Sequence, residues 1–139
     1  MRIIMLYVPS SSGKTTTINM VYTSILSTSS IVCPRQPLGG DPNDFEAVLD
    51  YSIKGITKKV AFFSMGDFAY EVFHAMSFYE GMGCDVLVCA CNNRFNIPIK
   101  RLNDRYNGIH PPVYKTVSTS SANQQADNSR DANIIIQLI

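Results

Sequence analysis

Three short, continuous runs of apolar residues alternate along the chain with segments whose apolar residues recur at helical spacing. The runs are Met1–Val8, Val60–Phe63 and Val86–Cys91. Such runs are typical of strands that are buried on both faces of a parallel sheet. A right-handed connection between parallel strands places its helix over one face of the sheet. We therefore expect an α/β fold of three layers, with a mostly parallel sheet of about five strands and helices on both faces.

Helical spacing is clearest in two segments. From Lys14 onward the apolar residues line one side of a helix, and a serine- and threonine-rich cluster at Ser27–Ser30 ends it. A second apolar stripe, with a period near 3.6, follows Asp67 and ends around Gly81–Gly83. The sequence therefore predicts one helix after the first strand and another after the Val60–Phe63 strand.

The other segments give weaker patterns. A short strand is predicted at Ile31–Cys33, and a turn at Gly39–Pro42. Asn43 or Asp44 can cap a modest helix over residues 43–53, where Phe45, Val48, Leu49 and Ile53 recur at helical spacing. Pro98 suits the first turn of a short helix.

The C-terminal part begins with a predicted fifth strand at Val113–Val117. The polar stretch Ser118–Asn128 contains almost no apolar residue, so we expect a loop there. Ile134, Ile135 and Leu138 then line one side of a final helix.

Length and charge limit the organisation and the partners of the chain. With 139 residues, 45% of them hydrophobic, it fits a single domain over residues 1–139. A formal net charge of +1 argues against extended contact with nucleic acid, so any anion site must be local. No apolar stretch approaches the roughly 20 residues that a membrane span needs. We expect a cytoplasmic protein without membrane contact.

The loop between the first strand and the first helix carries the most specific motif. Val8-Pro9-Ser10-Ser11-Ser12-Gly13-Lys14-Thr15-Thr16 resembles the Walker A loop, GxxxxGK[ST], of the P-loop NTPases. The resemblance implies a P-loop NTPase-like fold, a bound nucleoside triphosphate and Mg²⁺. It also implies a phosphate cradle formed by the amides of Ser11 to Thr15, with Ser10 at its start and Thr16 near the α-phosphate.

The same resemblance assigns roles to two side chains. Lys14 would bridge the outer phosphates as an exposed ligand, and the Thr15 hydroxyl would bind Mg²⁺. One departure stands out, because the leading glycine of the motif is replaced by the β-branched Val8. We expect this replacement to weaken affinity.

A second acidic group should support the magnesium ion, normally an aspartate at the end of a neighbouring strand. The strand at Val60–Phe63 runs into Ser64, with Asp67 three residues later, whereas Val86–Cys91 ends in Asn92. Asp67 is therefore the candidate for magnesium support, although it can equally act as the N-cap of the following helix.

Cationic residues beyond the loop could neutralise a moving phosphoryl group. Arg94 follows a strand end, at the sheet edge where parallel-sheet sites form. Lys100, Arg101 and Arg105 could form a lid, with a solvated helix face as the alternative, and Arg35 could meet an acceptor phosphate. The chain contains no guanine-reading NKxD tetrad, so that ATP is the expected nucleotide, with another triphosphate as the alternative.

A looser resemblance covers the middle of the chain. Ser64-Met65-Gly66-Asp67, a helix, and then Gly83–Cys91 are similar to small uncharacterised P-loop proteins of bacterial and phage genomes. This resemblance implies no activity.

Two functions from different classes remain open. The first is a small Mg²⁺-dependent phosphotransferase, similar to nucleotide kinases, or an NTPase, with catalytic roles for Lys14, Asp67 and Arg94 and with a small molecule or a nucleotide as the phosphate acceptor. The second is a non-catalytic or slow nucleotide-dependent binding module. Such a module would act through a partner or through a homo-oligomer interface formed by the C-terminal helix.

Overall fold

The computed structural model describes residues 1–9, 13–98, 100 and 113–139. Along the chain the elements are β1 (Arg2–Val8), α1 (Lys14–Leu26), β2 (Ser29–Leu38), β3 (Asp41–Ile53), β4 (Ile56–Phe63), α2 (Ala69–Gly81), β5 (Val86–Asn92), β6 (Val113–Tyr114) and α4 (Ser121–Leu138). No helix in these ranges combines the length and the apolar character that crossing a membrane requires.

The strands form one mixed sheet of six strands in the order β2-β3-β4-β5-β1-β6. β1 pairs in parallel with β5 and β6, and β4 pairs in parallel with β5. β3 is antiparallel to both β2 and β4. The sheet therefore has a parallel centre, and an antiparallel meander extends one side of it.

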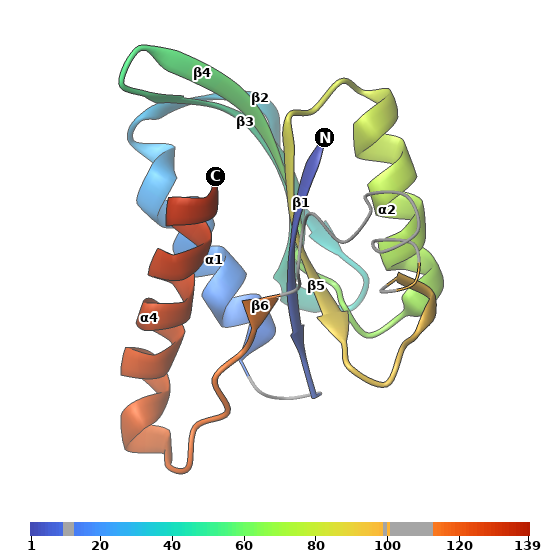
Figure 1. The fold of residues 1–139 in the computed structure, drawn as a ribbon, viewed down its shortest axis with the longest axis vertical. Helices are drawn as coiled ribbons and strands as arrows, with labels where there is room; N and C mark the ends of the chain where they lie inside the picture. Colours follow the sequence, from blue (N-terminus) through green and yellow to red (C-terminus); the bar gives the residue numbers. More distant parts are fainter. Residues whose placement is uncertain (10–12, 99, 101–112) are drawn as a thin grey trace.

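Two apolar clusters cover the two faces of the sheet. α1 and α4 pack side by side over one face, and α2 packs over the other (Figure 1). Alternate residues of β5 belong to opposite clusters, and all seven of its residues are buried. This burial on both faces explains why β5 reads as a continuous apolar run.

The meander contradicts the predicted fold. A three-layer, P-loop NTPase-like fold with a mostly parallel sheet of about five strands is wrong, because β2, β3 and β4 are joined by antiparallel pairing. The predicted helix over residues 43–53 is instead strand β3. Its apolar residues also alternate with period two, and four of them are buried in the cluster under α1, namely Phe45, Ala47, Leu49 and Tyr51.

Turn chemistry fixes the register of this meander. Ile53 pairs with Ile56, which leaves Lys54 and Gly55 as a two-residue loop. Both have positive φ, 51° and 78° respectively. Positive φ at both positions is the signature of a type I′ turn, whose twist matches that of antiparallel strands.

The boundaries of β2 and α4 also differ from the sequence-based expectation. β2 is longer than predicted and occupies the sheet edge, where Pro34 and Pro37 are tolerated because an edge strand leaves some amides unpaired. α4 starts at Ser121, inside the stretch predicted as a loop. The short helix predicted after Pro98 falls almost entirely outside the described residues.

Candidate functional site

At the edge of the sheet where its parallel strands end, residues from the parallel and the antiparallel parts lie together. β1, β4 and β5 are parallel, so their carboxyl ends share this edge. β3 runs the opposite way, so that its amino end arrives at the same edge, where the Ser64 amide donates to the Phe45 carbonyl at 3.0 Å. The meander thereby brings Asp41 and Asp44 to the end of the sheet from which α1 begins.

The N-terminus of α1 lies at this edge. Gly13 is the residue before the helix, with φ 86° and ψ 20°, and no side chain of a described residue caps the first turn. The first intrahelical bond runs from the Thr17 amide to the Gly13 carbonyl at 2.9 Å. The amides of a first helical turn have no intrahelical acceptor and, with the helix dipole, favour anions. Ser10, Ser11 and Ser12 lie outside the described residues.

Lys14 is buried rather than exposed, which differs from the expectation. It is only 6% exposed, and its Nζ lies 3.5 Å from Oδ1 of Asp67, which is 53% exposed. The charge of its ammonium also affects the Cys91 thiol near the end of β5. Burial raises the pKa of the Cys91 thiol to about 12, while Lys14 acts in the opposite direction. Lys14 therefore lies over the strand ends, with a carboxylate on its solvent side.

Thr15 and Asp44 form the shortest polar contact of the site. The Thr15 hydroxyl donates to Asp44 Oδ1 at 2.7 Å. The buried Ser64 hydroxyl donates to the same oxygen at 3.2 Å and accepts from the Phe45 amide at 2.8 Å. These bonds fix the Asp44 carboxylate against the first turn of α1.

These groups line a cavity of about 190 Å³, which we call the acid–loop pocket. Its lining comprises Gly13, Lys14, Thr15, Thr16, Asp41, Asp44 and Asp67. Three carboxylates therefore face one ammonium. Among the described residues no three His, Cys, Asp or Glu side chains are grouped closely enough to hold a metal ion by themselves.

Gly66 sets the position of Asp67. A Cβ on Gly66 would lie 2.7 Å from the carbonyl carbon of Ala90, closer than real Cβ contacts. The Gly66 carbonyl accepts from the Asn92 amide at 2.9 Å. The loop after β4 can therefore lie directly on the end of β5 only because residue 66 has no side chain.

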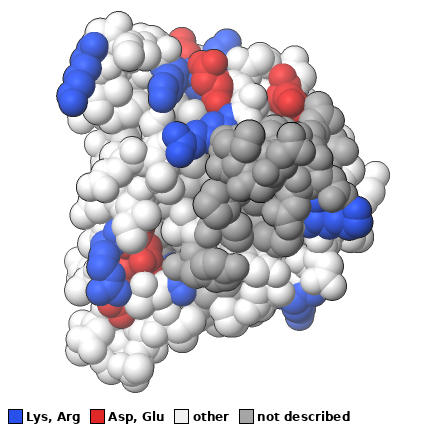
Figure 2. Space-filling view, viewed as in Figure 1, with Lys and Arg blue, Asp and Glu red and all other residues white. Residues whose placement is uncertain are grey.

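Two of the other predicted cations, Arg94 and Arg35, do not line the acid–loop pocket. The Arg94 guanidinium lies over the Phe95 ring, 5.1 Å from its centroid, and Arg94 is not among the residues that line the acid–loop pocket. Arg35 lies over the Phe45 ring at 4.5 Å and donates to Asn19 Oδ1 at 3.0 Å. Arg101 and Arg105 lie outside the described residues. On the face seen in Figure 2, the described acidic and basic side chains are interspersed.

Sequence reasoning missed the two acids at the start of β3. Asp44 was interpreted as the cap of a helix over residues 43–53, and Asp41 as part of a turn. Two signals indicate the strand: the alternation of apolar residues from Phe45 to Tyr51, and the Lys54-Gly55 turn that closes it.

Comparison with known proteins gives no further guide. No family model matches the chain, and no curated protein or solved structure shows significant similarity to it.

Proposed function

We propose that this chain binds a nucleoside triphosphate with Mg²⁺ in the acid–loop pocket, and that it is a magnesium-dependent NTPase or phosphotransferase. The observation that carries the proposal is the convergence on one cavity of an uncapped helix N-terminus, the Lys14 ammonium and the hydrogen-bonded pair of Thr15 and Asp44. The uncapped amides and the ammonium suit phosphate oxygens. The hydroxyl and the carboxylate suit a hard cation.

The charge of the pocket makes the cation necessary. Three carboxylates line it beside one ammonium, so a bare polyphosphate would be repelled. Mg²⁺ typically takes one or two protein carboxylates and completes its shell with water and phosphate oxygens. The Thr15 hydroxyl and Asp44, whose oxygens are 2.7 Å apart, fit that requirement, with Asp41 near by. The ion would neutralise charge on the phosphates.

Lys14 and Asp67 would act on the outer phosphates. Burial of Lys14 holds its ammonium at the strand ends with little freedom to point elsewhere. Asp67 lies on its solvent side, and a half-exposed carboxylate there can accept a hydrogen bond from an attacking water or from an acceptor hydroxyl. The same pair therefore serves hydrolysis and transfer.

One observation favours the alternative, a non-catalytic or slow binding module. Lys14 is the single cation among the described residues that line the pocket, and Arg94 is held against Phe95. Phosphoryl transfer gains much of its rate from further cations around the moving group. With one ammonium, occupancy by nucleotide would serve mainly to order a surface for a partner or for a second copy of the chain.

Calorimetric titration tests the proposal. We expect ATP to bind in the presence of Mg²⁺, and its affinity to fall at least tenfold when the metal is chelated. Lys14→Met keeps most of the buried side-chain volume and should abolish binding, whereas Lys54→Met, in the exposed β3–β4 turn, should leave it unchanged. Absence of ATP, GTP, CTP and UTP binding to the native protein would contradict the proposal. Phosphate release from the bound complex separates the enzyme from the binding module.

A further inference from the structure

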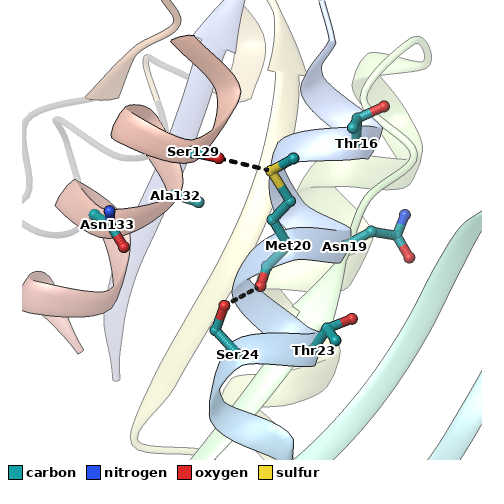
Figure 3. A pocket seen from close by; sticks show the side chains of 8 residues that line it. All are labelled: Thr16, Asn19, Met20, Thr23, Ser24, Ser129, Ala132 and Asn133. Atoms are coloured by element: carbon teal, nitrogen blue, oxygen red, sulfur yellow. Dashed lines mark hydrogen bonds between the residues drawn. The ribbon is translucent and has the colours of Figure 1, made fainter. Parts of the chain in front are cut away.

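A second and larger cavity, of about 440 Å³, lies between α1 and α4. Thr16, Met20, Thr23 and Ser24 of α1 line it together with Ser129 and Asn133 of α4. In Figure 3 the α1 and α4 side chains lie on either side of the space, with the Met20 sulfur directed toward the Ser129 hydroxyl at 3.9 Å. We call this cavity the α1–α4 groove.

The lining defines the kind of ligand that the groove can hold. All of its side chains are neutral, either polar or apolar. From Thr16 to Ser24 the groove follows α1 for about 12 Å, given a rise of 1.5 Å per residue. Its volume falls within the roughly 300–1,000 Å³ of cavities that hold small molecules. These properties suit an uncharged molecule with several donors and acceptors.

The groove and the acid–loop pocket adjoin each other at Thr16. Thr16 lines both cavities, and it lies in the first turn of α1. Asp44 and Asp67 line the acid–loop pocket but not the groove. A ligand whose phosphates occupy the first turn, with its metal at Asp44, can therefore extend its uncharged part past Thr16 into the groove.

An unsatisfied polar group lies beside the first turn of α1. Asn128, the residue before Ser129 of α4, is 3% exposed, and its Oδ1 has no hydrogen-bond partner among the described residues. That oxygen would be 2.8 Å from a Cβ on Gly13, so the amide faces the N-terminus of α1. A buried acceptor without a donor is costly and therefore uncommon. Neither lining includes Asn128, so a ligand hydroxyl would supply the donor only after this side chain turns toward the ligand.

We propose that the α1–α4 groove binds the nucleoside half of the triphosphate, with the sugar hydroxyls at Ser129 and the base against Met20 among the neutral polar side chains. The inference rests on the proposed function, since the phosphates set the direction of the ligand. It adds a prediction that the phosphate site alone does not make, namely that affinity depends on the nucleoside.

Calorimetry against two kinds of probe tests this. The tightest-binding of ATP, GTP, CTP and UTP is compared with inorganic tripolyphosphate, both with Mg²⁺. We expect the nucleotide to bind at least tenfold more tightly. Ser129→Trp and Thr23→Trp, which fill the groove from opposite helices at exposed positions, should remove that advantage and leave tripolyphosphate affinity within twofold. Ile134→Trp, exposed on α4 outside the groove lining, is the matched control and should change neither affinity.

The outcomes separate the two proposals. If tripolyphosphate binds as tightly as every nucleotide, or if folded groove variants keep full nucleotide affinity, the groove does not hold the nucleoside, and the phosphate site stands. If the native protein binds neither class of probe, both proposals fail. Circular dichroism and thermal unfolding establish that each variant is folded, and the two groove variants provide independent tests.

Discussion

The hydroxyl of Thr15, at the start of the first helix, donates a 2.7 Å hydrogen bond to Asp44, at the start of an antiparallel strand. The two residues come from different parts of the sheet architecture. The helix follows a parallel strand, whereas the acid arrives on a strand that runs the opposite way. The relation between these two side chains therefore depends on the meander as much as on the loop.

Replacing Asp44 separates its charge from its position. Asp44→Asn keeps the shape but removes the carboxylate that we propose binds Mg²⁺, so we expect the affinity for Mg²⁺·ATP to fall at least tenfold, about 1.4 kcal/mol or more. Affinity for tripolyphosphate without metal should rise, because one repulsive carboxylate is lost. Asp41→Asn, in the same pocket but without a bond to Thr15, should reduce Mg²⁺·ATP affinity less. Equal losses in the two variants, measured by calorimetry, would contradict a special role for Asp44.

Gly13 is constrained twice, by its backbone and by Asn128. Its φ of 86° is costly for any residue with a side chain, and a Cβ would meet Asn128 Oδ1 at 2.8 Å. Gly13→Ala should lower the free energy of unfolding by about 1–2 kcal/mol from the backbone alone, and by more with the clash. In an Asn128→Ala background only the backbone cost should remain. Urea denaturation of the two pairs checks this, and identical costs in both backgrounds would exclude the contact.

A buried ion pair joins the middle of α4 to the segment that follows β6. Lys115 Nζ lies 3.0 Å from Asp131 Oδ2, and the two side chains are 0% and 2% exposed. Burial works against the charged form of Asp131, but the Thr116 amide, Lys115 and the Thr116 hydroxyl together hold the pKa of the carboxyl below its usual value. The stability from this pair is thus present above the ordinary aspartate pKa, about 4, and is lost as the pH falls through the lower folded value.

Asp131→Asn should therefore lower the free energy of unfolding at pH 7 by about 3–5 kcal/mol, because it leaves a buried ammonium without its counterion. Carboxylates that are paired in the folded protein become protonated at about pH 5 to 2. The variant should therefore lose less stability than the native protein over this range. Asp127→Asn is the control, since its partner Arg130 is 59% exposed and such pairs contribute about 0–1 kcal/mol. Similar losses in both variants, from denaturation at several pH values, would argue against the buried pair.

The sequence predicted those helices and strands whose burial pattern is visible within the element itself. The strand at the N-terminus, the helix after Gly13 and the fully buried β5 were all predicted, because burial on both faces or along one helical stripe leaves a direct trace in the sequence. Lys14 and Thr15 were identified from the motif and lie together in one pocket.

The meander was not predicted because its sequence satisfies two periods. Phe45, Val48, Leu49 and Ile53 fit a helix, while Phe45, Ala47, Leu49 and Tyr51 fit a strand. The segment forms a strand because it pairs with two neighbouring strands. This pairing joins residues that are distant in the sequence, so a local pattern does not contain it. The position of Asp44 depends on it, so no local pattern could place this carboxylate beside Thr15.

Because Asp44 lies on a pleated strand, the position of its carboxylate in the pocket depends on the number of residues in that strand. The positions of the loop residues do not. Successive side chains of a strand point to opposite faces, so one residue inserted between Asp44 and Phe45 would turn the carboxylate to the other face of the sheet. Gly13, Lys14 and Thr15 would keep their places, but the Asp44 carboxylate would no longer lie beside Thr15. If the pocket binds Mg²⁺ as proposed, a change of spacing alone would then remove the magnesium dependence, with every residue of the motif intact.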